Sequence, residues 1–81
     1  MAAGGSYPGG DELARRLGVT QREFHRTIKP EILRQLRQEA KSIQSTNPDI
    51  GVDGAGNVVL RHPHSGAEIF TDVPLSSFAP D

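Results

Sequence analysis

The sequence predicts an α+β fold in which N-terminal helices pack on a small three-stranded antiparallel β-meander. In the first half of the chain apolar residues recur at helical spacing, and in Ile50–Thr71 short apolar runs alternate with tight-turn residues. No apolar run approaches the length of a signal sequence or a membrane span, so no membrane contact is expected. Three strands this short are not stable alone in water, and the helices are therefore expected to cover one face of the sheet.

The length and composition bound the organisation of the chain. With 81 residues it makes one small domain, whose core seldom supplies more than about 3–5 kcal/mol. Residues 1–10 are rich in Gly, Pro and Ala, which predicts a flexible tail or linker before a single domain over residues 11–81. The chain has no cysteine, which excludes disulfides and thiolate metal sites and leaves the redox compartment open.

Two short helices are predicted at the start of the domain. Asp11 can cap the first, and Gly18 can end it in a left-handed conformation. Thr20 can cap the second, which covers residues 21–29. Pro30 removes a backbone donor and disfavours helical angles at the preceding residue, so the helix is expected to stop or kink there. The buried side chains are expected to be Leu13, Ala14, Leu17, Phe24 and Ile28.

The strongest helical pattern in the chain is Glu31–Ile43, which starts with Pro30 at a favoured first-turn position. Its apolar stripe consists of Ile32, Leu33, Leu36, Ala40 and Ile43. This helix is expected to lie across the sheet, and the loop 45–49 is expected to lead into the first strand.

The sheet is expected to consist of the strands Ile50–Val52, Val58–Leu60 and Ile69–Thr71. Turns are predicted at residues 53–57 and 62–66. In the second turn, Pro63 suits the second position of a reverse turn and Gly66 suits its exit.

The segment after Thr71 contains Pro74, which is incompatible with a central strand. Residues 72–78 are therefore expected to form an extended tail that packs Leu75 and Phe78 on the core.

The basic residues are concentrated in the helical half. Eight of the nine Lys and Arg residues lie between Asp11 and Lys41, where the net charge is +3, whereas Arg61 is the single basic residue from residue 46 onward. Such a division suits a polyanion on one side and a basic partner protein on the other. Solvated helix faces with intrahelical pairs such as Glu12–Arg16 explain the same pattern.

Residues 11–29 resemble the helix-turn-helix of transcription regulators. Ala14 is followed four residues later by Gly18 and six residues after that by an apolar residue, Phe24, and the second helix is polar enough to enter a major groove. Pro30 cuts that helix after barely two turns, however, and no helix precedes the motif. A packed helical corner without DNA binding is the simpler interpretation.

A second group of residues has the composition of a metal-independent ribonuclease site. RNA cleavage needs a base for the 2′-hydroxyl, an acid for the 5′-oxygen and cations for the charge that develops on phosphorus. Histidine titrates near neutrality and suits the first two roles, while Lys and Arg suit the third. His25 and Lys29 lie one turn apart on a predicted helix, and Arg61, His62 and His64 lie at the end of the second strand. The two sets meet only if helix and sheet bring them together.

The later part of the chain resembles a known family. The run Asn47–Asp53, the run Gly56–Arg61, a Pro-x-Ser-Gly turn and the run Thr71–Pro74 resemble the end of the C-terminal toxin domains of bacterial polymorphic toxins, which are the variable tips of contact-dependent, Rhs-type and related effectors. Leu17-Gly18-x-Thr20 and the run Phe24–Pro30 fit the same pattern, so the resemblance covers roughly residues 12–78. The three predicted strands and the pI of about 6.3 depart from the usual four or more strands and basic pI of such domains.

The resemblance implies a function and a setting. Many such tips are small α+β ribonucleases that are secreted or delivered into the cytoplasm of a target bacterium, and each is neutralised by a cognate immunity protein. Carried over to this chain, it implies His25, Lys29, Arg61 and Thr71 as catalytic residues acting on RNA, with His62 as a further candidate. The expected contacts to nucleic acid are Arg22, Arg26 and His64.

Other interpretations remain open from the sequence. His62 and His64 offer two metal ligands, but no acidic residue lies nearby at a ligand spacing, so neither a metal nor another cofactor is expected. The main alternative to an enzyme is a non-enzymatic DNA- or protein-binding module that uses the corner at residues 11–29, and a third is an effector acting on a protein. The free domain is expected to be a monomer.

Overall fold

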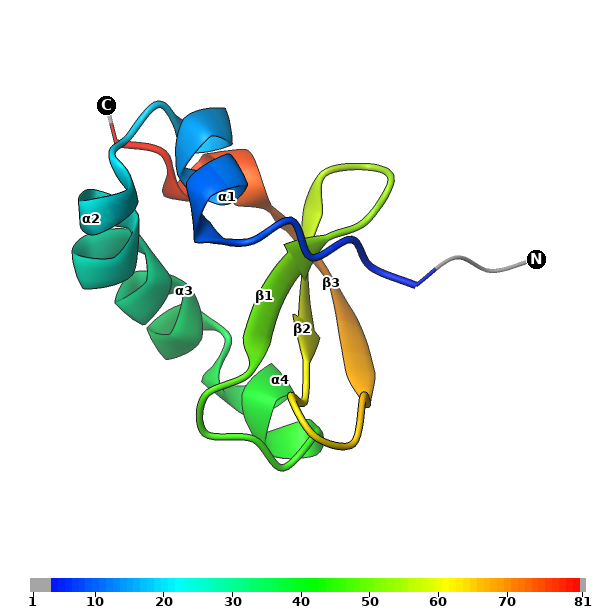
Figure 1. Ribbon diagram of the computed structural model, residues 1–81. Helices are drawn as coiled ribbons and strands as arrows, with labels where there is room; N and C mark the ends of the chain where they lie inside the picture. The colour runs from blue at the N-terminus through cyan, green and yellow to red at the C-terminus, as the bar shows by residue number, and fades with distance from the viewer. Residues whose placement is uncertain (1–3, 81) are drawn as a thin grey trace.

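In residues 4–80, which the computed structural model describes, helices precede a three-stranded antiparallel sheet, as predicted (Figure 1). The α-helices are α1 (Gly10–Leu17), α2 (Gln21–Glu23), α3 (Lys29–Gln35) and α4 (Arg37–Ser42), and the strands are β1 (Asp49–Val52), β2 (Asn57–Arg61) and β3 (Glu68–Pro74). A π-helical turn, η1 (Phe24–Ile28), joins α2 to α3, and a 3₁₀ turn, η2 (Leu75–Phe78), follows β3. Asp81, at the end of the predicted domain, lies outside the described residues.

The corner between α1 and α2 follows the predicted capping chemistry with one correction. Gly18 ends α1 in the left-handed conformation (φ 71°, ψ 28°), and the Thr20 hydroxyl accepts a hydrogen bond from the backbone of Glu23 at 3.0 Å, as predicted. Asp11 does not cap α1. The helix begins at Gly10, with Gly9 as the N-cap residue, whose carbonyl accepts from the backbone of Leu13. Asp11 lies in the first turn, where a carboxylate interacts favourably with the helix dipole.

The helix does not stop at Pro30, which corrects one of the two predicted outcomes, a stop or a kink. It runs through η1, where the backbone N–H of Lys29 donates to the carbonyl of Phe24, five residues back. A π-helical turn shifts the hydrogen-bond register by one residue just before the proline, whose nitrogen has no proton to donate. Pro30 therefore falls in the first turn of α3, a position that tolerates it, and α2, η1 and α3 form one continuous arm (Figure 1).

The helix predicted over Glu31–Ile43 is instead divided at Leu36, where the backbone leaves helical angles (φ −104°, ψ 30°). The prediction missed this bend because the local sequence has neither Gly nor Pro. Leu36 is 3% exposed, and the bend turns α4 against β3 so that Ala40 also reaches the core. Tertiary packing has overridden local helix propensity here.

The predicted hairpin β1–β2 is present, and in its register Asp49 pairs with Arg61 and Val52 with Val58. Its turn is held by the Asp53 carboxylate, which accepts from the backbones of Ala55 and Asn57 at 2.9 Å each. The second predicted turn is also confirmed. There the backbone N–H of Gly66 donates to the His62 carbonyl, and Gly66 adopts φ 77°.

Strand β3 is longer than predicted and contains a bulge. It continues to Pro74 because it is an edge strand, where a missing N–H leaves no ladder bond broken. Phe70 pairs with Val59 and Pro74 pairs with Asn57, so the intervening residues 71–73 of β3 face the single residue Val58. The segment that follows is η2 rather than an extended tail, but Leu75 and Phe78 are buried in the core as predicted.

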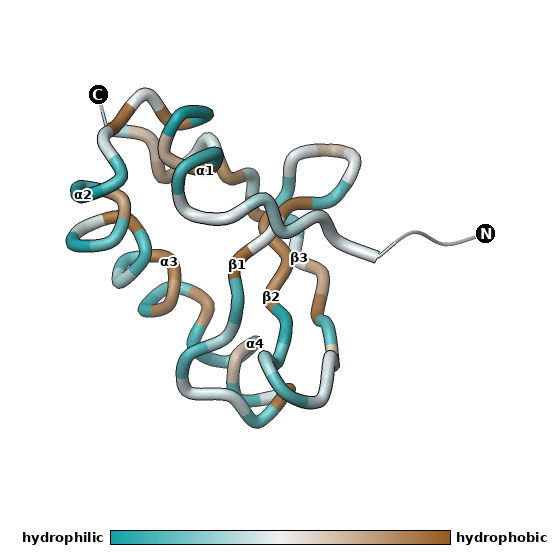
Figure 2. The backbone as a smooth tube through the Cα atoms, viewed as in Figure 1, coloured by the Kyte–Doolittle hydropathy of each residue, from teal (hydrophilic) through white to brown (hydrophobic). Residues whose placement is uncertain are grey.

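The core lies between the helices and one face of the sheet. Figure 2 shows apolar segments of α3 opposite those of β1 and β2. The buried core cluster consists of Leu13, Ala14, Leu17, Phe24, Ile28, Ile32, Leu36, Ala40, Ile50, Val52, Val58, Leu60, Leu75 and Phe78. These residues include every side chain predicted to be buried in the first two helices, and the helical half covers one face of the sheet as predicted.

The second face of the sheet is partly covered by residues 4–9, called here the N-terminal strap. Ser6 exchanges two backbone hydrogen bonds with Val52 on the free edge of β1, at 2.7 and 2.9 Å. Val59, which is 0% exposed and outside the main core cluster, lies under Gly5, where a Cβ would approach its side chain to 3.1 Å. Gly51 likewise leaves room for the Tyr7 ring.

The described part of residues 1–10 makes contacts with the sheet that its composition did not indicate. Glycine at the strap and on the strand beneath it permits close backbone approach rather than flexibility. Residues 1–3 of the predicted tail lie outside the described residues.

Candidate functional site

A pocket of about 230 Å³ opens at the free edge of β1, between the sheet and the helical arm. The pocket is lined by residues of the strap, α1, η1, α3, β1 and β2. These residues are Tyr7, Gly9, Gly10, Leu13, Phe24, His25, Lys29, Asp49, Ile50 and Arg61. Small-molecule pockets usually start at roughly 300 Å³, so this one suits a fragment of a larger ligand, such as one phosphate with its sugar.

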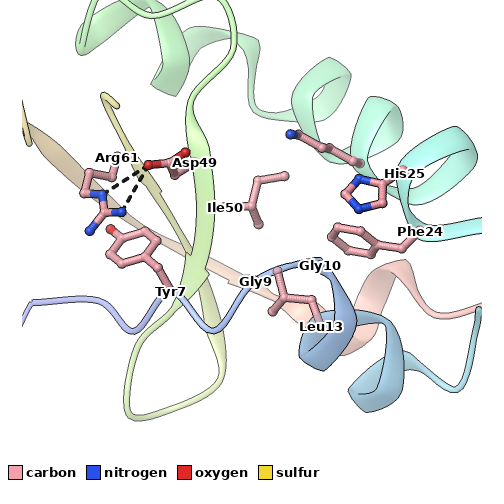
Figure 3. Close-up of a pocket in the computed structure, with 10 residues that line it drawn as sticks. Tyr7, Gly9, Gly10, Leu13, Phe24, His25, Asp49, Ile50 and Arg61 are labelled. Carbon is pink, nitrogen blue, oxygen red and sulfur yellow. Dashed lines mark hydrogen bonds and ion pairs between the residues drawn. The ribbon is translucent and has the colours of Figure 1, made fainter. Parts of the chain in front are cut away.

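Three of the predicted catalytic residues line this pocket. His25 comes from η1, Lys29 from the start of α3 and Arg61 from the end of β2. Within the described residues, no hydrogen bond or ion pair joins any two of them. Figure 3 shows Arg61 on one side of Ile50 and His25 on the other, so a ligand would have to bridge the two sides.

Arg61 is held in place by two neighbours. Its Nε and Nη2 atoms donate to Oδ2 of Asp49 at 3.4 and 3.1 Å, and its guanidinium carbon lies 3.8 Å from the centre of the Tyr7 ring (Figure 3). The Arg61 and Asp49 side chains are 38% and 42% exposed, so the ion pair itself adds little stability. Its effect is to fix a guanidinium and a carboxylate at the pocket wall.

Tyr7 is in turn held by Glu68 on β3. The phenol donates to Oε2 of Glu68 at 2.5 Å, and the backbone N–H of Gly5 donates to the same oxygen at 2.9 Å. Burial, followed by this hydrogen bond, raises the pKa of the Tyr7 phenol well above its ordinary value. The hydrogen bond from Tyr7 lowers the pKa of Glu68. Tyr7 is therefore a neutral donor to an ionised carboxylate at neutral pH.

His25 and Lys29 occupy the opposite wall, on consecutive turns of the helical arm. His25 is exposed, and its ring stands edge-on to Phe24 with the ring centres 5.5 Å apart. A Cβ at Gly10 would come within 2.6 Å of Nε2 of His25, so glycine at the start of α1 makes the space that the imidazole occupies. Lys29 is half-buried beside it.

The arrangement suits an anionic ligand. One imidazole, one ammonium and one guanidinium face the pocket, and the single carboxylate is already paired with the guanidinium. The first turn of α1 also begins at the pocket wall with Gly9 and Gly10, whose backbone N–H groups favour anions. Imidazole and carboxylate are groups that can transfer protons to or from such a ligand.

Thr71, another predicted catalytic residue, is not brought to this pocket. Its hydroxyl donates to the backbone carbonyl of Val58 at 2.7 Å and accepts from the backbone N–H of Val73 at 3.2 Å. These bonds replace the ladder bonds that the bulge in β3 interrupts. Thr71 therefore closes the bulge.

His62 and His64 lie in the turn between β2 and β3, outside the pocket lining. The Nδ1 atom of His62 accepts from the backbones of His64 and Ser65 at 3.1 Å each, and the two imidazole rings have their centres 5.8 Å apart. His62 thus stabilises its own turn. Within residues 4–80, no group of three His, Cys, Asp or Glu side chains is arranged to hold a metal ion.

Arg22 and Arg26 are exposed one turn apart on the helical arm, where they line a shallow hollow with Thr20, Glu23 and Thr27. This hollow belongs to the corner formed by α1, α2 and η1. The two helices of the predicted helix-turn-helix are present, while DNA binding by them stays a prediction. No helix in the described part of the chain is long and apolar enough to span a bilayer.

Sequence reasoning missed Tyr7 and Asp49. Asp49 had a detectable signal, because the turn at residues 53–57 sets it directly opposite Arg61 in the hairpin. Tyr7 had none, because its partners Arg61 and Glu68 lie more than fifty residues away in sequence.

Comparison of the chain with protein-family models, with curated proteins and with solved structures finds no match in any of the three.

Proposed function

We propose that the chain is a metal-independent endoribonuclease whose active site is the pocket at the edge of β1. The observation that carries the proposal is the gathering of His25, Lys29 and Arg61 around one small pocket from three separate elements. Each of these residues was selected from the sequence for a role in RNA cleavage. A pocket rich in cations, with two proton-transfer groups, fits a phosphodiester better than a neutral ligand.

In the proposed reaction, the Asp49 carboxylate accepts the proton of the ribose 2′-hydroxyl. The 2′-oxygen forms a bond to phosphorus, and the bond from phosphorus to the 5′-oxygen breaks as His25, in its protonated form, gives that oxygen a proton. The products are a 2′,3′-cyclic phosphate and a 5′-hydroxyl. Lys29 and Arg61 stabilise the extra negative charge on the phosphoryl oxygens, and Tyr7 and Glu68 hold Arg61 in position.

The test is cleavage of RNA by the full chain in the presence of EDTA, with product ends identified by their 2′,3′-cyclic phosphates. The strap belongs to the pocket, so residues 4–10 must be present. His25→Gln is expected to lower the rate by about 10²–10⁴-fold, the usual contribution of a general acid. Gln38→Ala, at an exposed position outside the pocket lining, is the control and is expected to leave the rate unchanged. His64→Gln separately tests the predicted contact to nucleic acid in the turn beyond β2.

Intact RNA with the wild-type protein would refute the enzyme proposal, and dependence on His64 rather than His25 would refute the pocket. If DNA binding is salt-sensitive and no RNA is cleaved, the binding module at residues 11–29 becomes the better proposal.

We also propose, from the sequence resemblance alone, that this ribonuclease is the toxic tip of a bacterial effector. It would then act in the cytoplasm of a target bacterium and be neutralised by a cognate immunity protein. Expression of the full chain in bacteria is expected to stop growth and leave discrete RNA fragments. Growth arrest should be lost with His25→Gln and relieved by co-expression of the adjacent open reading frame. Growth unaffected by wild-type protein that demonstrably cleaves RNA in vitro would contradict the toxin setting.

A further inference from the structure

A second groove, of about 390 Å³, lies on the helical arm at the bend between α3 and α4. Its aliphatic lining includes Pro30, Leu33 and Ala40, and its basic lining consists of Arg34, Arg37 and Lys41. None of these residues belongs to the pocket described above.

The positive charge of this groove is only partly compensated. Arg34 is paired with Glu31, whose Oε1 it contacts through Nε at 3.0 Å. Arg37 and Lys41 are exposed, and neither forms an ion pair within the described residues. Two cations are therefore available to an external anion.

The groove begins on the same helix, α3, that carries Lys29 of the first pocket. His25, Lys29, Leu33, Arg37 and Lys41 recur every four residues, the first three before the bend at Leu36 and the last two beyond it on α4. The first two line the pocket and the last three line the groove. Lys29 of the pocket and Leu33 of the groove are four residues apart, or about 6 Å along α3 at about 1.5 Å per residue.

We propose that this groove binds the sugar–phosphate backbone of single-stranded RNA to one side of the bond that is cleaved. The inference rests on the ribonuclease function proposed for the first pocket and adds a substrate preference for strands long enough to reach Lys41. Unpaired guanidinium and ammonium groups bind phosphates, and the aliphatic floor accommodates ribose and base faces. Continuity with the pocket favours RNA over an acidic protein partner.

The test compares the double variant Arg37→Gln/Lys41→Gln with Arg15→Gln/Arg16→Gln. The control pair removes the same charge from the exposed face of α1, where both arginines contact Glu12. All four side chains are exposed, and circular dichroism checks that both variants fold. Binding of fluorescein-labelled single-stranded RNA is measured by anisotropy over a range of salt concentrations, in the His25→Ala background to prevent cleavage.

Loss of the groove cations is expected to weaken oligonucleotide binding about tenfold and to reduce the slope of log K against log salt by about 1.4, because each phosphate contact contributes about 0.7 for single strands. In the wild-type background, kcat/KM should fall for the oligonucleotide and stay unchanged for a dinucleotide. The control pair should leave the affinity, the salt slope and kcat/KM unchanged.

Unchanged affinity and salt slope would overturn the proposal. Equal losses of affinity in the groove variant and in the control pair would also overturn the proposal, because such losses would reflect net charge alone. Retained RNA binding with loss of binding to an acidic protein would assign the groove to a protein partner. Failure of the wild type to cleave any RNA is a separate result, since it concerns the pocket while anisotropy reports on the groove.

Discussion

Replacing Thr71 by valine tests whether this residue closes the bulge in β3 or takes part in catalysis. Valine has nearly the shape of threonine but no hydroxyl. The change removes the hydrogen bond to the Val58 carbonyl and the bond accepted from Val73. Val58 is 0% exposed, so water cannot readily replace the lost donor at its carbonyl.

A buried carbonyl left without a donor costs about 1–3 kcal/mol, and we therefore expect Thr71→Val to lower the free energy of unfolding by about 2 kcal/mol. For a domain of this size that loss corresponds to a fall in Tm of roughly 8–16 °C. With a urea m-value of about 1 kcal/mol/M, the midpoint should fall by about 2 M. Urea unfolding followed by circular dichroism measures it, and Thr71→Ser, which keeps the hydroxyl, is the control.

Below the unfolding transition, Thr71→Val should cleave RNA at the wild-type rate. A variant with wild-type stability that cleaves RNA poorly would refute the structural role and return Thr71 to the list of catalytic candidates. A fall in stability that Thr71→Ser reproduces would show that the hydroxyl is not the relevant group.

Two further predictions concern the strap. Gly51→Ala would place a Cβ in a clash with the backbone oxygen of Ser6 and should release the strap. Release of the strap is expected to lower RNA cleavage and to change the fluorescence of Tyr7, the single tyrosine in a chain without tryptophan. Gly54→Ala, with no atom within 4 Å of its Cβ, is the matched control, and equal fluorescence changes in both would contradict the prediction. The strap should also loosen at both pH extremes. The pKa of Glu68 is lowered in the fold, so its contribution is present above the ordinary carboxyl value of about 4.3 and is lost as pH falls through the folded pKa. The pKa of Tyr7 is raised, so its contribution is present below about 10 and is lost as pH rises through the folded pKa. If the fluorescence of Tyr7 does not change as the pH is lowered through the acid range, the predicted loosening at low pH is contradicted.

The parts of the fold that the sequence predicted are those with strong local signals. Gly18 and Thr20 act through backbone geometry and a single hydrogen bond within a few residues, so their roles can be read directly. The turn at Asp53 is similarly local, and it sets the register of the whole β1–β2 hairpin. The apolar spacing of the helices identified their buried faces for the same reason.

The missed features depend on contacts between distant parts of the chain. The bend at Leu36 follows from packing of α4 on β3, and nothing in its neighbours along the chain indicates it. No signal in the sequence indicated the contacts of the strap, in which Gly5 lies against the Val59 side chain and Gly51 lies against the backbone of Ser6 and the ring of Tyr7. The extension of β3 to Pro74 was also missed. Proline is tolerated there because β3 lies at the edge of the sheet, and the order of strands in a sheet is not encoded in the sequence of one strand.

The candidate site was predictable in its chemistry more than in its geometry. His25 and Lys29 were identified together because helical spacing relates them, and the structure sets both on one pocket wall. Arg61 and Thr71 were catalytic candidates from the sequence and His62 was a further one, but only Arg61 lines the pocket. The other two make hydrogen bonds to nearby backbone, and such bonds depend on a bulge and a turn whose details no residue pattern specifies.

The π-helical turn η1 has a consequence for how this chain tolerates length changes. A π turn holds one residue more than the α turn it replaces, and here it carries His25 and leads into α3, which carries Ile32. Deleting one residue within η1 would restore an ordinary helix and rotate everything downstream by about 100° relative to His25. Ile32 would then leave the core or His25 would leave the pocket. The extra residue thus allows His25 to face the pocket while Ile32 faces the core. Insertion or deletion of a single residue in η1 should therefore destabilise the fold or the pocket far more than a substitution there.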